Sequence, residues 1–150
     1  MITTNGANIL LAFILKGNVA ADSVTDITGA QNASSISISA LSLAKMFVPS
    51  SSSGVKMYFG ASDKAESPDD YVLDDPVISS TNGTCGKSAD KWFVTTTFTN
   101  NGSDPLVIKE IGVTAGTQSN NKEYLIARKV VPARTVAVGE TATFTFTLDF

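Results

Sequence analysis

Four aspartates lie close together in the segment "SPDDYVLDDP", residues 67–76: Asp69, Asp70, Asp74 and Asp75. Carboxylates at this density could ligate a metal ion, act as a pair of catalytic acids, or bond to the backbone of a turn. Calcium loops place oxygen ligands at alternate positions around a glycine and end on a bidentate glutamate. Here two adjacent pairs are separated by "YVL", with no glycine between them. The pattern therefore favours a corner of the chain, with a weak surface cation site and paired catalytic carboxylates as the alternatives.

The same corner has an expected local structure. Ser67 and Asp69 are expected to cap a single turn, and the ring of Pro68 fixes the φ angle inside it. Tyr71 and Leu73 are expected to point inward. The second aspartate pair, which precedes the second proline, then opens the next turn.

The segment "STNGTCGKS", residues 80–88, ends like a phosphate-binding P-loop. That motif needs a glycine five residues before Gly86, where this chain has Thr81, and a helix after the loop. The following "ADKWFVTTTF" is typical of a strand, so the segment is expected to be a glycine-rich turn. Cys85 within it is expected to be an ordinary thiol, because the chain has no histidine to activate it.

Glu110 lies in the apolar stretch "IKEIGV", and two cations, Arg128 and Lys129, follow in the next expected strand. Opposite charges on neighbouring strands stabilise each other across the ladder. Glu110 is therefore predicted to be half-buried in a cross-strand ion pair with one of these cations. A catalytic role for it lacks a partner.

The composition argues against whole classes of function. The chain of 150 residues has no histidine, so it lacks the commonest general base and metal ligand. Its single cysteine allows no internal disulfide and no thiolate-rich metal site. A net charge of −3, with 11 scattered Lys and Arg, is unsuited to nucleic acid. We therefore expect no enzyme activity, no cofactor, no metal, no small-molecule substrate and no nucleic-acid partner.

Residues 4–16, "TNGANILLAFILK", predict one helix, with Thr4 or Asn5 as its N-cap and Lys16 at its C-terminal end. Apolar residues surround nearly the whole helix, so either the domain or a neighbouring subunit must cover it. These candidate interface residues are Ile9, Leu10, Leu11, Phe13, Ile14 and Leu15. The run is too short to span a bilayer, and its lysine follows rather than precedes it, unlike a secretory signal. We expect no membrane association.

From residue 36 to residue 150 the apolar period is two, as in strands with one dry and one wet face. In the last segment, "TATFTFTLDF", threonines alternate with apolar residues, and in "KWFVTTTFT" the same alternation places Trp92 on the core face. "SISISALSLAKMFV" changes phase between Ala40 and Leu41, which indicates a bulge. Seven or eight such strands predict a single all-β domain over residues 1–150: an antiparallel β-sandwich, jelly-roll-like or Ig-like, with one N-terminal helix.

Three stretches resemble tail and collar proteins of tailed bacteriophages. The opening "ITTNGANILLAFIL" is similar to their first helix, and "MYFGASDKAESPDDYVLDDPV" to their strand, loop and Asp-Tyr-x-Leu segment. The closing "FTNNGSDPLVIKEIGV…YLIARKVVP…VAVGETATFTFTLDF" resembles their final hairpins. This resemblance implies a virion structural protein of the tail, neck or baseplate, found in the virion and partnered by copies of itself and by other virion proteins.

The residues point in the same direction, because an all-round apolar helix needs a cover. Phe150 ends the last strand, which is expected to add to the sheet edge of a neighbour. A capsid decoration or head-fibre protein is the alternative within the same class. A receptor-binding or glycan-binding module is the second alternative; it would need exposed aromatic platforms, whereas the only tryptophan is expected to lie in the core.

Overall fold

The computed structural model describes residues 1–14, 18–19, 24–31, 36–37, 55–88, 91–116 and 122–149. The elements are α1 (Thr4–Ile14), β1 (Asn18–Val19), β2 (Ile36–Ser37), β3 (Val55–Gly60), β4 (Pro76–Asn82), β5 (Thr84–Ser88), β6 (Lys91–Thr99), β7 (Leu106–Gly116), β8 (Glu123–Val136) and β9 (Thr141–Asp149).

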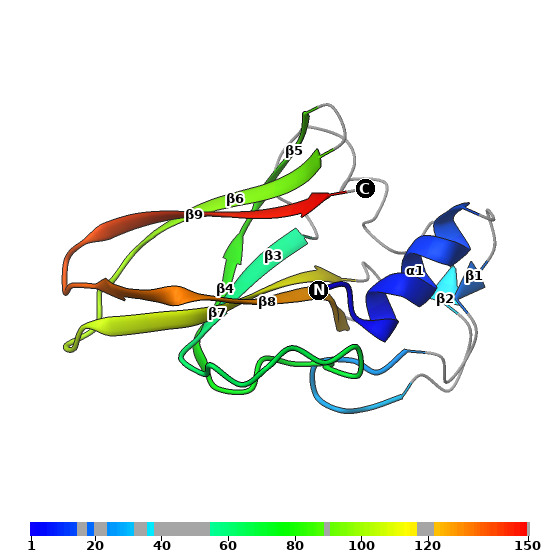
Figure 1. The fold of residues 1–150 in the computed structure, drawn as a ribbon, viewed down its shortest axis with the longest axis horizontal. Coiled ribbons are helices and arrows are strands. Elements are labelled where there is room, and N and C mark those ends of the chain that lie inside the picture. Colours follow the sequence, from blue (N-terminus) through cyan, green and yellow to red (C-terminus); the bar gives the residue numbers. More distant parts are fainter. Residues whose placement is uncertain are drawn as a thin grey trace.

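Two antiparallel sheets form the two layers of the molecule (Figure 1). One has the strand order β4-β3-β7-β8 and the other has the order β5-β6-β9, while β1 and β2 form a small separate pair. The prediction of an all-β antiparallel sandwich with one N-terminal helix is confirmed. Most of the expected strand at residues 36–49, including its bulge at Ala40 and Leu41, lies outside the described residues.

The core lies between the inner faces of the two sheets, where the period-two alternation places it. Trp92 and Val94 of β6 are 2% and 0% exposed, which confirms the predicted position of the tryptophan. Three phenylalanines meet across the layers: the ring centroid of Phe59 lies 5.0 Å from that of Phe98 and 4.8 Å from that of Phe144. Aromatic rings at these separations add to the stability that burial provides.

The glycine-rich turn predicted for residues 80–88 is wrong, because strands β4 and β5 occupy most of that segment. Gly83 alone separates them, and the chain passes there from one sheet to the other. A Cβ atom at Gly83 would lie only 2.3 Å from Cγ1 of Val94. The glycine is therefore needed for close approach to the core rather than for a phosphate-binding loop.

The helix lies beside one end of the sandwich and not between its sheets (Figure 1). The described part ends at Ile14, so the predicted C-terminal end at Lys16 lies outside the described residues. Within the described part of the chain, no helix is long and apolar enough to cross a membrane.

Candidate functional site

The aspartate segment forms the predicted corner, but Asp70 has the role expected of Asp69. The Ser67 amide donates to the Asp70 carboxylate at 2.9 Å, and the Asp70 amide donates to the Ser67 carbonyl at 3.1 Å. Leu73 is buried as predicted, whereas Tyr71 is 40% exposed and does not point inward. In this tight turn the Asp70 side chain points inward, toward Arg128, and the Tyr71 side chain lies at the surface.

Asp70 belongs to a buried ion network centred on Arg128, which is 1% exposed. Arg128 donates from Nε to Glu110 Oε2 and from Nη1 to Asp70 Oδ2, both at 2.8 Å. The predicted pairing of Glu110 with Arg128 is confirmed, but Glu110 is fully buried rather than half-buried. Gly112 pairs with Arg128 in the β7–β8 register, and a Cβ atom there would lie 2.8 Å from Cδ2 of Leu73 and 2.8 Å from Cδ1 of Leu125, so the missing side chain leaves room for these two leucines.

Glu110 has further partners that fix the loop before β4. Its carboxylate accepts the amides of Asp74 at 3.3 Å and Asp75 at 2.9 Å. Gly60 lies opposite it in β3, where a Cβ atom would come within 2.2 Å of Glu110 Oε1. With its oxygens engaged by a guanidinium and two amides, Glu110 anchors the loop before β4.

The guanidinium remains charged in this environment. Burial by itself would lower the pKa of Arg128, but the hydrogen bonds and charges of Glu110 and Asp70 outweigh burial and raise that pKa. Arg128 also donates to the backbone carbonyls of Lys64 and Ala65. A single buried cation therefore joins β7, β8 and the loop after β3.

The first three residues add a short strand to the outer edge of β8. The Thr3 amide donates to the Ile126 carbonyl at 3.0 Å, and the Arg128 amide donates to the Met1 carbonyl at 2.9 Å. The Met1 ammonium lies 3.0 Å from Glu66 Oε2. This part of the β8 edge is therefore occupied by the chain itself.

Glu66 joins the N-terminus to the same edge. Its other oxygen accepts the Val130 amide at 2.8 Å. Burial would raise the pKa of Glu66, but the Val130 amide and the Met1 ammonium outweigh burial and hold that pKa below its usual value. Glu66 is therefore a charged clamp between the N-terminus and β8.

The helix begins on a cap that differs from the predicted one. Thr3, rather than Thr4 or Asn5, is the N-cap: its Oγ1 accepts the Gly6 amide at 3.1 Å, and its carbonyl accepts the next amide in the helix. The Asn5 side chain instead bonds the backbone of Thr25, as donor at 2.6 Å and as acceptor at 2.9 Å. A Cβ atom at Gly6 would lie 2.1 Å from the Ile126 carbonyl oxygen, so the first helical turn rests directly on β8.

The predicted interface residues of this helix differ in how far the chain itself buries them. Ile9 is 0% exposed within the chain itself and so is not available to a neighbour, contrary to the expectation. Leu10 is half-buried. The side chains of Leu11, Phe13 and Ile14, and the residues Leu15 and Phe150 as a whole, lie outside what the structure describes.

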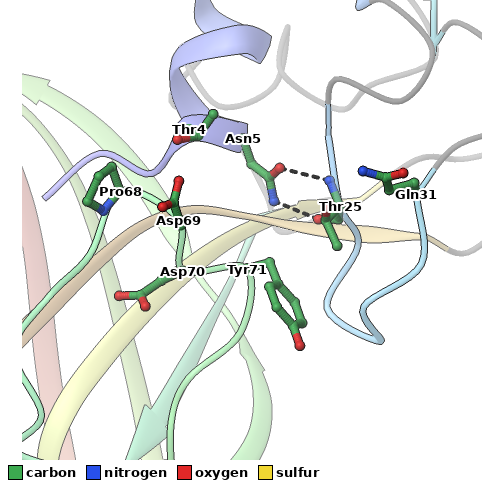
Figure 2. Close-up of a pocket in the computed structure, with 8 residues that line it drawn as sticks. All are labelled: Thr4, Asn5, Thr25, Gln31, Pro68, Asp69, Asp70 and Tyr71. Carbon is green, nitrogen blue, oxygen red and sulfur yellow. Dashed lines mark hydrogen bonds between the residues drawn. The ribbon is translucent and has the colours of Figure 1, made fainter.

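A polar hollow of about 250 Å³ lies where the helix N-terminus meets the aspartate corner (Figure 2). It is lined by Thr4, Asn5, Thr25, Gln31, Pro68, Asp69, Asp70 and Tyr71. The amide of Asn5 and the carboxylate of Asp70 already have protein partners, and Asp69 is exposed. The described residues contain no group of three or more His, Cys, Asp or Glu side chains arranged to hold a metal ion.

A second hollow of about 200 Å³ lies next to the start of β8, and the turn at residues 26–28 forms one side of it. Asp26 is 4% exposed and accepts the Thr28 amide at 2.9 Å and the Ala30 amide at 3.1 Å. Burial would raise the pKa of Asp26, but these bonds, the Thr28 hydroxyl and the nearby Lys122 hold it below its usual value. The carboxylate is a structural acceptor.

Cys85 lies in β5 and is buried, rather than in the polar turn expected for it. Burial raises the pKa of its thiol to about 11. The nucleophilic thiolate is therefore rare at neutral pH, which agrees with the prediction of an ordinary thiol.

The outer face of β6 and β9 is covered by paired threonines. The hydroxyl oxygens of Thr95 and Thr145 are 3.0 Å apart, and two further pairs along the strands lie at 2.8 Å. Such cross-strand pairs stabilise a sheet. The face is polar and regular, and its hydroxyls bond to one another.

No protein-family model, curated protein or solved structure matches this chain. The function must therefore be inferred from the residues and the geometry above.

Proposed function

We propose that this chain is a non-enzymatic structural subunit of a tailed-phage virion, located in the tail, neck or baseplate, that assembles through α1 and through its edge strands. Its partners would be copies of itself and other virion proteins. The placement of the helix carries the proposal: α1 is apolar nearly all round, yet it lies beside the sandwich rather than between the sheets (Figure 1). The chain itself buries Ile9, and a neighbour would cover those apolar residues of α1 that the chain does not bury.

The ion network centred on Arg128 supports the role of a rigid structural subunit. Arg128 links β8 to Glu110 of β7 and to Asp70 of the aspartate corner, so one buried cation holds segments far apart in the sequence. The carboxylates of Asp70, Asp74 and Glu110 accept hydrogen bonds from other parts of the chain. This use favours a building block over a catalyst.

Mass spectrometry of purified particles tests the proposal directly. The chain should be present in intact particles, and gold-labelled antibody should mark the tail, neck or baseplate. Labelling of the head would favour the capsid decoration alternative, and absence from particles would contradict the proposal.

A variant pair tests the helix. Leu10→Glu places a charge on the half-buried side of α1, whereas Thr4→Glu places the same charge at an exposed position of the same helix. The first substitution should reduce incorporation into particles and the second should not. Equal incorporation of both folded variants would show that the helix is not the assembly surface.

Exposed Tyr71 is one observation that favours the glycan-binding alternative. It stands beside a polar hollow that carries Asp69 and Asn5, and sugars bind where an aromatic ring adjoins such groups (Figure 2). A glycan array compares the native chain with Tyr71→Ala. Binding that the substitution abolishes would support this alternative, and an array without hits would remove it.

A further inference from the structure

Along β9, the backbone amides and carbonyls of alternate residues point toward β6, and those of the residues between them point away from β6. The Asn100 amide donates to the Glu140 carbonyl at 2.9 Å, one step beyond the register pair Thr99–Thr141. Hydrogen-bonded pairs alternate with non-bonded pairs in an antiparallel ladder. The even-numbered residues of β9 therefore bond to β6, and the odd-numbered residues point their amides and carbonyls outward.

A bond from Arg134 confirms that the odd-numbered carbonyls point away from β6, because its Nη1 donates to the carbonyl of Thr143 at 3.1 Å. Beyond that contact, the described residues place no strand on the outer side of β9, which is the edge of its sheet. With respect to the described strands, Thr145 and Thr147 thus present their amides and carbonyls along an unpaired edge.

Apart from Arg134, which reaches the edge at Thr143 and Phe144, β9 itself carries none of the usual protection against pairing. Natural edges are shortened, bulged, or interrupted by lysine or proline. The segment "TATFTFTLD" extends over 9 residues, contains no lysine, arginine or proline, and pairs with β6 without a register shift. By contrast, the edge of β8 is covered from Ile126 to Val130 by the N-terminal residues and Glu66. Among the described strands, β9 therefore keeps a long and regular edge that can pair.

We infer that β9 pairs antiparallel with β9 of a second copy, about a twofold axis at Thr145. The strand is centred on that residue, so a twofold register aligns its full length from Thr141 to Asp149. Threonine then faces threonine on the outer side. On the inner side Phe144, whose ring centroid lies 4.8 Å from the Arg134 guanidinium, is aligned with Phe146 of the second copy. The two three-stranded sheets join into one continuous sheet.

The pairing repeats chemistry that the domain already uses. Thr145 bonds Thr95 across the β6–β9 ladder, and a threonine of the second copy would extend that row of hydroxyls. The Thr143 carbonyl has two lone pairs, so Arg134 can share it with an incoming amide. The inference deepens the proposed assembly role by naming the partner of one edge, and it rests on that role.

Two lysine variants form the test, with light scattering and sedimentation equilibrium over a range of concentrations. Thr145→Lys and Thr95→Lys each break the same threonine pair, so their effects on the fold are matched. Only the first places two lysines against each other at the twofold axis. We expect a native dimer, a dissociation constant raised about tenfold or more by Thr145→Lys, and little change with Thr95→Lys.

Cysteine cross-linking checks the register. Directly opposed bonded residues in an antiparallel pair have Cα atoms about 5.5 Å apart, within disulfide range. Thr145→Cys should therefore oxidise to a covalent dimer, while Thr95→Cys on the same face should not. Buried Cys85, with a thiol pKa of about 11, should not compete.

Three results would overturn the inference: a native chain that is monomeric at every concentration, a dimer that survives Thr145→Lys, or equal loss in both lysine variants. Different results would contradict the proposed function and the β9 pairing. A dimer that is absent from particles contradicts the virion role alone, whereas a monomer found in particles contradicts the β9 pairing alone.

Discussion

Replacing Arg128 with methionine should remove a large part of the stability of this domain. The guanidinium is 1% exposed and lies 2.8 Å from the carboxylate of Glu110, which is 0% exposed. Methionine fills similar space but leaves the Glu110 charge buried without its cation. The carboxylate of Asp70 and the carbonyls of Lys64 and Ala65 lose the same donor.

The expected loss follows from the burial of both partners. Removing one member of a buried ion pair costs about 3–5 kcal/mol. Glu110 keeps the amides of Asp74 and Asp75, which places the loss near the lower end, at about 3 kcal/mol. A domain of this size loses about 2–4 °C of melting temperature per kcal/mol, so the shift should be roughly 6–12 °C.

Urea and thermal unfolding measure the loss, with Arg134→Met as the matched control. Arg134 is on the same strand, but its side chain is 45% exposed. It lies 3.8 Å from Glu140, 3.1 Å from the Thr143 carbonyl and 4.8 Å from the centre of the Phe144 ring, so its loss should cost about 1–2 kcal/mol. Hydrogen exchange should also rise across residues 64–75 in the Arg128 variant alone. Adding Glu110→Gln to Arg128→Met should restore part of the stability, because it removes the unpaired charge.

Equal losses in the two arginine variants would refute this reasoning. So would a double variant that is less stable than Arg128→Met by itself. Either result would mean that the buried pair does not hold the loop as its geometry indicates.

Three further outcomes are expected. Acid should destabilise the fold below about pH 4.5, because the pKa values of Glu66 and Asp26 are lower in the folded chain than in the unfolded chain. The stability that these carboxylates provide is fully present above their unfolded pKa values. It is lost as the pH falls through their folded pKa values. Melting curves at successive pH values test this, and Glu66→Gln should flatten the slope; an unchanged slope would contradict it. Cys85, with a pKa of about 11, should react with a thiol reagent at pH 8 far more slowly in the folded chain than in guanidinium, and equal rates would refute its burial. Gly6→Ala should lower the melting temperature and expose α1 to protease, because its Cβ would lie 2.1 Å from the Ile126 carbonyl oxygen; a rise of the kind that helix propensity predicts would mean that the helix does not rest on β8.

The elements that follow from local pattern were predictable. In β9 the alternation of threonine with phenylalanine specifies one wet and one dry face, because successive side chains of a strand point in opposite directions. The apolar run at Thr4–Ile14 likewise predicts a helix. The ion pair of Glu110 with Arg128 was also predictable, since both residues lie on strands that follow each other in the chain.

Relationships between distant segments were not predictable. Asp70 and Arg128 are 58 positions apart, and no periodicity connects a loop to the strand that it covers. The exposed position of Tyr71 follows from that contact, because the turn directs Asp70 inward instead. Glycine usually signals a turn, so the sequence predicts a turn at residues 84–88 where the structure has a strand; Gly83 instead provides close contact with Val94.

The amino-acid sequence by itself determined the sandwich, its helix and the faces of its strands, because these depend on periodicity within each segment. Only the tertiary structure decided that Arg128 fastens the aspartate corner, that Thr3 begins the helix and that β9 is the last of the described strands in its sheet. These features depend on which segments meet in space, and each meeting is set by packing and hydrogen bonding across the whole domain.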